Sequence, residues 1–407
     1  MGQRVLIRAA LIAAVLASGC YSPGVNRCLY HCTADRGCPD NLTCNTDNWC
    51  ARAEDDTCDN AVDAAIDVAP DSSCGWDTSN IDVCANAFVD VILPWTIGSA
   101  TVINTDAETV TPPLPAGITM KRLQQIGGGE ALVIAVGALD VNAALDVHGA
   151  IPLIIFASET AVITSDIIVA PTVRSAGATC DGHVGAAATG TKGGGGGGGG
   201  SFGGPGASGG DGGKTSGAAP QGGAAGAALT VALTPLTGGC PGGDGGSNTA
   251  NKGGRAGGGI QISARTRIRI TGGTVQANGA GGSAASASNS GGGGGGAGGG
   301  ILLESPEIKL MLSRLCANGG GGGGSQAGFD GLMSDCSGAA IGGGQPGTVD
   351  VGGDGATAAS VADPGRAGMA ATMSHGGGGG GGGLGRIRLR TAVPDIVTST
   401  ISPAATP

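Results

Sequence analysis

Histidine, aromatic residues and catalytic motifs are all scarce in this sequence. Aromatic side chains make up 2% of the 407 residues, and four histidines are scattered along the chain: His31, His148, His183 and His375. No HExxH, GxSxG or Cys–His signature occurs, so the sequence predicts no catalytic residue, no cofactor and no bound metal. We therefore expect that the chain is not an enzyme.

Positive charge is also in short supply. Lys and Arg number 21 against 31 Asp and Glu, which gives a net charge of −10. An acidic surface repels nucleic-acid phosphates, and this balance argues against nucleic acid as a partner.

A hydrophobic run long enough to span a bilayer is missing at the N-terminus. Arg4 and Arg8 are positive, and the apolar stretch Ala9 to Val15 that follows is only as long as the core of an export signal. We expect residues 1–19 to be a cleaved signal peptide that takes no part in the fold.

The residues Leu16 to Cys20, LASGC, place small side chains directly before a cysteine. This resembles a bacterial lipobox, which implies cleavage before Cys20 and attachment of lipid to its thiol. Ala17 departs from the commoner Leu at its position. Tyr21, in place of Asp, favours an outer-membrane lipoprotein of the cell envelope by the same resemblance. The alternative is an ordinary signal peptide with Cys20 in a disulfide.

Cysteine is abundant, with 13 residues in the chain. Setting Cys20 aside leaves an even number, as expected for disulfides in an exported protein. Six lie in residues 20–58 and predict a small disulfide-stapled module: Cys28, Cys32, Cys38, Cys44, Cys50 and Cys58. Their pairing is left open, and a zinc site is the less favoured alternative because His31 lacks ligand spacing. Residues 59–72 are an acidic linker rich in Asp and Ala.

Apolar and polar residues alternate from Gly257 to Gly279. Ile260, Ile262, Ala264, Thr266, Ile268 and Ile270 share one parity, and Gln261, Ser263, Arg265, Arg267 and Arg269 share the other. A period of two predicts β-structure with one apolar face and one face that meets solvent or acidic groups.

This pattern recurs in Leu132 to Gly149, Leu153 to Ala170, Gly298 to Gly319 and Gly385 to Val393. Each repeat is about 20 residues long and cannot bury its apolar face alone, whereas stacked repeats can. The sequence therefore predicts an all-β fold, a β-solenoid resembling a parallel β-helix over 132–397. Residues 73–131 are expected to form a β cap, and 398–407 a tail.

Most of the 87 glycines lie in three insertions at 171–257, 280–298 and 319–383. Three interpretations compete: disorder, a phosphate-binding loop, and packed extended glycine helices like polyglycine II. The phosphate loop lacks its motif and its helix. We favour glycine helices because two cysteine pairs, Cys180 with Cys240 and Cys316 with Cys336, would pin these loops. Cys74 and Cys84 are expected to pair locally in the cap region. A calcium site at the GGDG segments is disfavoured, since the repeated calcium-binding frame is absent.

The order of lipobox, Cys-rich module, acidic linker and glycine-interrupted β-repeats resembles the glycine-rich lipoproteins of myxobacteria and related Gram-negative bacteria. The glycine tracts are similar to mycobacterial PE-PGRS proteins in composition only. The resemblance covers nearly the whole chain and implies an architecture, with no activity to carry over.

The functional hypotheses follow from this architecture. The first is a structural or adhesive lipoprotein, held to the membrane by lipid on Cys20 and contacting envelope or matrix polysaccharide. Two arginine rows are its candidate contacts with an acidic glycan: Arg265, Arg267 and Arg269, and Arg386, Arg388 and Arg390. The second is a polysaccharide-acting β-helix enzyme that uses Asp140 and Asp146. The third is a protein that binds ice or a polymer surface through a glycine-helix face.

Overall fold

The computed structural model divides the chain into two units, Met1–Asp71 and Ser72–Pro407. It describes residues 43–44, 50–51 and 74–406, except 172–179, 181–192, 215–217, 230–232, 247–250, 288, 325–327, 329–335, 337, 345–350, 358, 364 and 366–374. In the first unit, strands β1 (Thr43–Cys44) and β2 (Cys50–Ala51) pair antiparallel. The predicted signal peptide, Cys20, the linker and most of the Cys-rich module lie outside the described residues.

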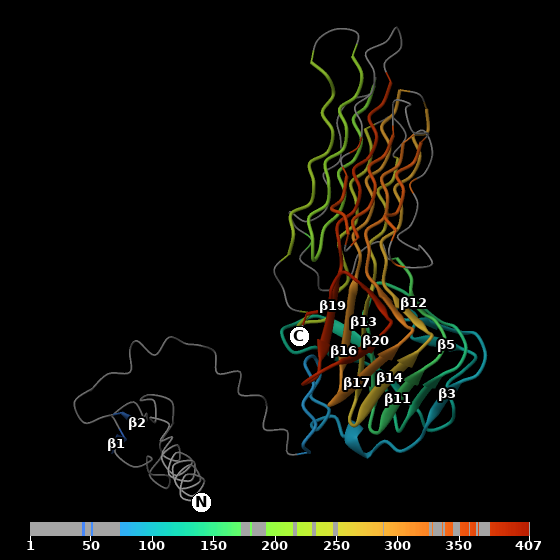
Figure 1. Ribbon diagram of the computed structural model, residues 1–407, viewed down its shortest axis with the longest axis vertical. Coiled ribbons are helices and arrows are strands. Elements are labelled where there is room, and N and C mark those ends of the chain that lie inside the picture. Colours follow the sequence, from blue (N-terminus) through green and yellow to red (C-terminus); the bar gives the residue numbers. More distant parts are fainter. Residues whose placement is uncertain are drawn as a thin grey trace, which may run out of the picture. The chain divides into compact units, whose positions relative to one another are not determined.

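The second unit contains three sheets whose central strands are parallel (Figure 1). Each repeat supplies one strand to each sheet, so the chain winds through all three in turn. The first two coils are β7 (Glu130–Val136), β8 (Leu139–Val141) and β9 (Leu145–His148), then β10 (Leu153–Ala157), β11 (Thr160–Ile163) and β12 (Ile167–Val169). The next three are β13 (Gly259–Ala264), β14 (Arg267–Thr271) and β15 (Thr274–Gln276); β16 (Gly300–Glu304), β17 (Glu307–Met311) and β18 (Arg314–Cys316); and β19 (Arg386–Arg390), β20 (Asp395–Val397) and β21 (Thr400–Ser402). The all-β, β-solenoid-like prediction is confirmed, and the described residues contain no α-helix.

The coils stack in register because equivalent apolar residues lie above one another. Leu132, Leu153, Ile260, Ile301 and Ile387 form one such column across five coils. All five side chains are buried in the core enclosed by the sheets. Each coil therefore buries its apolar face against its neighbours.

Parallel pairing continues beyond the five coils at the N-terminal end and includes β21 at the C-terminal end. In the region predicted as a cap, β3 (Trp95–Ile97) and β4 (Thr101–Asn104) pair parallel with β8 and β9. The antiparallel strands β5 (Thr109–Thr111) and β6 (Met120–Gln124) border this end, and a 3-10 turn, Phe88–Asp90, precedes them. In the predicted tail, β21 pairs with β18. Strands this short gave too few residues for a periodic pattern.

A second core covers the outer face of the sheet formed by β7, β10, β13 and β16. Trp76 and Phe88 pack on Phe156, with ring centroids 5.8 and 5.7 Å apart. The first glycine-rich insertion adds four large side chains: Phe202, Leu229, Leu233 and Leu236. This sheet is thus buried on both faces.

The second core refines one prediction. We expected Gln261 and Ser263 on a face that meets solvent or acidic groups. Both are fully buried on β13, where both donate to the Glu304 carboxylate. Alternation identified the two faces of the strand, but it did not show that a distant segment would cover the second one. Arg265, Arg267 and Arg269 are exposed, as predicted.

The described glycine tracts run as extended segments side by side above the sheets (Figure 1). Their backbones hydrogen-bond to one another with a period of three. The carbonyls of Gly196, Gly197 and Gly198 accept bonds at 2.8–2.9 Å from Gly223, Gly380 and Gly243. These donors lie in three separate extended segments, two of them within the insertion 171–257, and each such segment is called a tract below. The Gly199 and Gly200 carbonyls then accept from Gly226 and Gly383, which lie three residues beyond Gly223 and Gly380 in the same two tracts. Each stretch of three residues in this run therefore bonds to three neighbouring segments in turn.

The interior of this bundle has no room for a side chain. A Cβ atom placed on any residue from Gly195 to Gly200 would lie closer than 3.0 Å to a backbone oxygen of another tract. The same holds for Gly291 to Gly296 and Gly376 to Gly382, and all three runs are buried. The glycine runs are therefore explained by close packing of backbones.

Three disulfides occur among the described residues, and they join the pairs that the sequence predicts. Cys74 bonds to Cys84, Cys180 to Cys240, and Cys316 to Cys336. The last pair links the end of β18 to the third insertion, where Asn318 also donates to the Cys336 carbonyl at 3.1 Å. The disulfides fix where the glycine bundle meets the coils.

Candidate functional site: the Glu304–Arg390 network and its hollow

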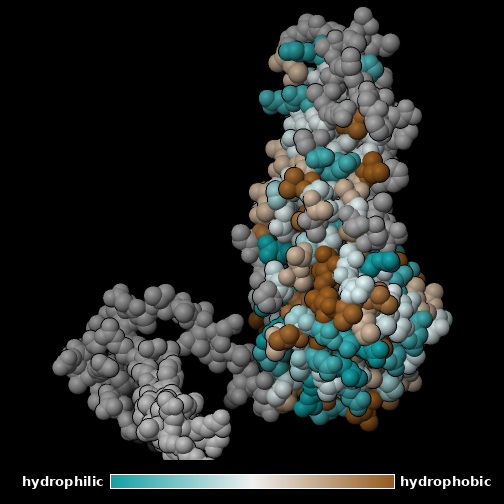
Figure 2. Space-filling model, in the orientation of Figure 1, coloured by the Kyte–Doolittle hydropathy of each residue, from teal (hydrophilic) through white to brown (hydrophobic). Residues whose placement is uncertain are grey.

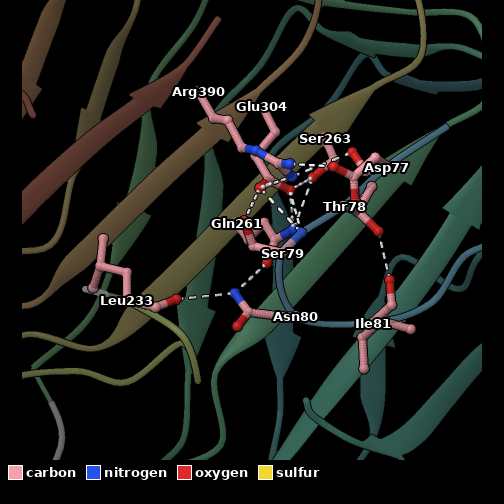
Figure 3. A network of polar contacts seen from close by, with 10 residues as sticks. All are labelled: Asp77, Thr78, Ser79, Asn80, Ile81, Leu233, Gln261, Ser263, Glu304 and Arg390. Atoms are coloured by element: carbon pink, nitrogen blue, oxygen red, sulfur yellow. Dashed lines mark hydrogen bonds and ion pairs between the residues drawn. The ribbon is translucent and has the colours of Figure 1, made fainter. Parts of the chain in front are cut away.

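Glu304, at the end of β16, is a charged side chain with only 3% of its surface exposed. Its Oε2 accepts hydrogen bonds from Gln261 Nε2 at 2.6 Å and Ser263 Oγ at 2.8 Å. Its Oε1 accepts from the Ser79 backbone N–H at 3.1 Å and from the Ser79 hydroxyl. Figure 3 shows these groups converging on the carboxylate. A buried carboxylate needs such donors to offset the loss of water.

Arg390, on β19, provides the countercharge. Its Nη1 lies 3.4 Å from Glu304 Oε1, and its Nη2 forms an ion pair with Asp77 (Figure 3). Burial would lower the pKa of Arg390, but the charges and hydrogen bonds of Glu304 and Asp77 outweigh that effect and raise it. The guanidinium thus joins the last coil to the segment before the first coil.

Asn80 extends the network to the first insertion. Its Nδ2 donates to Gln261 Oε1 at 2.8 Å and to the Leu233 carbonyl at 3.1 Å, while its buried Oδ1 has no partner (Figure 3). One connected set of polar contacts therefore ties residues 77–80 to three coils and to the chain beyond the first glycine tracts.

An open hollow of about 380 Å³ borders this network. Its charged lining residues are Asp77, Arg265, Glu304 and Arg390, and Trp76, Ser305 and Thr391 also line it. The hollow thus offers cationic, anionic and hydroxyl groups within one small space. Sequence analysis singled out Arg265 and Arg390 but missed Glu304 and Asp77, whose partners lie hundreds of residues away.

The two arginine rows do not form a single stripe. β19 pairs with β16 and β14 pairs with β17, so the rows belong to different sheets. On β19 the arginines lie beside Gly300, Leu302 and Glu304. A single stripe requires the two rows to lie on stacked strands of one sheet. Gly385 to Val393 instead corresponds to the first strand of each coil, whereas Arg267 and Arg269 lie on the second strand, β14.

Arg386 is occupied inside the fold. Its guanidinium lies over the Phe202 ring, 5.9 Å from the centroid, and donates to the Leu229 carbonyl. Burial lowers its pKa. This arginine holds the first insertion against the last coil, which makes it a poor glycan contact.

The other candidates are not brought together. Asp140 lies on β8 and Asp146 on β9, in two different sheets, so they form no carboxylate pair. His148 is exposed at the end of β9. Within the described ranges, no cluster of three or more His, Cys, Asp or Glu could hold a metal, and no helix is long and apolar enough to cross a bilayer.

The GGDG segments have a structural contact that the sequence did not suggest. Asp211, Asp244 and Asp354 each accept a backbone N–H from the adjacent antiparallel tract. The donors are Gly222, Gly253 and Gly342, at 2.9, 2.9 and 2.7 Å. Each carboxylate thus satisfies an amide of the bundle.

Comparison with known proteins gives no relative: no family model, no curated protein and no solved structure matches this chain. The functional argument therefore depends on the chain's own residues.

Proposed function

We propose that this chain is a non-catalytic protein of the cell envelope with a structural and adhesive role. The β-helix is its base, and the glycine tracts form a polyglycine-II-like bundle that holds an extended surface in a fixed shape. One observation carries this proposal: the successive carbonyls of Gly196, Gly197 and Gly198 accept hydrogen bonds from three different neighbouring tracts.

The proposed scaffold role requires the glycine bundle to be rigid. Glycine has the most conformational entropy to lose, so free tracts would be flexible. Here the tracts are bonded to one another and pinned by Cys180–Cys240 and Cys316–Cys336. A structure built from backbone alone has no interior side chains for chemistry, which suits a scaffold better than an enzyme.

The outside of the bundle supports an adhesive role. Along the tract 204–214, the side chains of Pro205, Ser208, Asp211 and Lys214 are exposed at every third residue. Figure 2 shows hydrophilic residues gathered over the lower part of the β-helix, and pale residues mixed with hydrophilic and hydrophobic ones along the described part of the bundle. Lipid on Cys20, with the resemblance to Gram-negative lipoproteins, would place this surface at the outer membrane.

Amide hydrogen exchange tests the bundle, and retention tests the role. Protected amides are expected over 193–200, 291–296 and 376–383. The Cys20→Ser full chain should be retained on immobilised envelope or matrix polysaccharide, with no release of reducing ends. Exchange of these glycines at the earliest time point would refute the scaffold, no retention would refute the adhesive role, and turnover would favour the polysaccharide-acting enzyme.

A second candidate is binding to ice or to a regular polymer surface. Gln221, Ala224 and Ala227 form an exposed row with a period of three, and a threefold extended helix repeats about every 9 Å. Such a flat, evenly spaced row favours a periodic ligand. Thermal hysteresis or inhibition of ice recrystallisation by the soluble chain would support this function. If both effects are absent, ice is ruled out as the ligand.

A further inference from the structure

Arg265 differs from the other charged residues around the hollow. It follows β13, is exposed, and donates through Nη2 to the Cys74 carbonyl at 3.3 Å. It has no carboxylate partner among the described residues, whereas Arg390 binds both Glu304 and Asp77. The hollow therefore has one cation that is not neutralised and one that is.

A second observation concerns Ser305, which directly follows Glu304 and lines the same hollow. Only 6% of this residue is exposed, and its buried Oγ has no hydrogen-bond partner. Buried hydroxyls are usually paired, so an orphan Oγ at the wall of a hollow indicates a place for a polar group from outside. Asp77, 39% exposed at its side chain, adds an acceptor on the other side of the ion pair.

We propose that this hollow binds one carboxylate-bearing sugar unit, a uronate, of an acidic polysaccharide. The sugar carboxylate pairs with Arg265, because a guanidinium binds a planar carboxylate through two parallel hydrogen bonds. Sugar hydroxyls bond to Asp77 and to the region of Ser305. Glu304 and Arg390 are positioning residues that hold the wall in place. This inference rests on the adhesive role proposed above and assigns it a site.

The size and charge of the hollow fit this ligand. A volume of about 380 Å³ accommodates a single sugar ring and not an extended chain. The four charged groups sum to zero without a ligand, so the hollow selects a ligand by where its charges lie and not by a general attraction of anions. One carboxylate placed at Arg265, with neutral hydroxyls elsewhere, matches the pattern of groups.

Calorimetric titration of the Cys20→Ser full chain with trigalacturonate tests the site, with neutral galactotriose as the second probe. Arg265→Gln should weaken trigalacturonate binding at least about tenfold, since a charge-assisted hydrogen bond is lost. Arg314→Gln is the matched control: it removes the same charge from an exposed arginine on β18, in another sheet and outside both arginine rows, and binding should stay within about twofold. Ser305→Ala should weaken binding with the melting temperature unchanged.

Three results would overturn the site. They are no binding by the Cys20→Ser chain, equal losses in Arg265→Gln and Arg314→Gln, and equal affinity for galactotriose. Retention of the chain on envelope polysaccharide in any of these cases would leave the adhesive role intact and remove only this site. Loss of both retention and binding would refute both proposals.

Discussion

The backbone N–H of Ser79 donates to Glu304 Oε1 at 3.1 Å, across 225 residues of sequence. Ser79 belongs to the segment that precedes the first coil, and Glu304 ends a strand of the fourth repeat. Together with Arg390, this contact fastens the start of the unit to its last coil. A solenoid whose neighbours otherwise contact only each other gains a long-range tie.

Removing the Glu304 carboxylate should therefore destabilise the whole unit. Glu304→Ala leaves Ser79, Gln261 and Ser263 without their acceptor, and we expect a loss of about 3 kcal/mol in the free energy of unfolding. Glu307→Ala, at an exposed position on β17, is the control and should cost less than about 0.5 kcal/mol. Denaturant unfolding measures both, and equal losses would contradict the role of Glu304.

Close packing of the bundle predicts a penalty for a single methyl group. Gly197→Ala places a Cβ against the Gly243 carbonyl and should cost about 2 kcal/mol. Faster amide exchange is expected in the neighbouring runs 291–296 and 376–383. Gly98→Ala, where a Cβ meets nothing within 4 Å, should leave exchange unchanged. Unaltered protection in Gly197→Ala would mean that the tracts do not pack as described.

The aspartates of the bundle should act without calcium. Asp354→Ala removes the acceptor of the Gly342 N–H, and we expect faster exchange of that amide and a loss of about 2 kcal/mol. Asp363→Ala, an exposed carboxylate, serves as control. Calcium should leave the melting temperature of the unmodified chain unchanged, whereas stabilisation by calcium that Asp354→Ala abolishes would restore the metal interpretation.

The two insertion disulfides should differ in strength according to the loops that they close. Cys180 and Cys240 are 60 residues apart, and Cys316 and Cys336 are 20 apart. The chain-entropy relation gives about 4 kcal/mol for the longer loop and about 3 kcal/mol for the shorter. Unfolding of the two paired Cys→Ser variants measures this order, and a larger loss from the shorter loop would show that native contacts outweigh loop entropy.

Much of the fold was predictable because its information is local. Alternation from Ile260 to Ile270 identified both faces of each strand, and the recurrence of the pattern in Leu153 to Ala170 predicted two stacked repeats, which pair with Ala157 beside Ala264. The candidate site was predictable only through Arg265 and Arg390. Glu304 is one acidic residue in a repeat, and its partners Ser79 and Asp77 are too distant for any periodic pattern to relate them.

The sequence by itself determined the coils and the disulfide pairs, since periodic apolar residues and even cysteines constrain each segment separately. Only the tertiary structure decided which outer face is covered, where the arginine rows lie and why the glycines are needed. Gln261 and Ser263 are buried where Asn80 donates to Gln261 and where both residues donate to Glu304. Gly197 tolerates no Cβ because the Gly243 carbonyl lies against it. Contacts of this kind depend on chains meeting in space, and composition alone cannot distinguish a packed glycine from a free one.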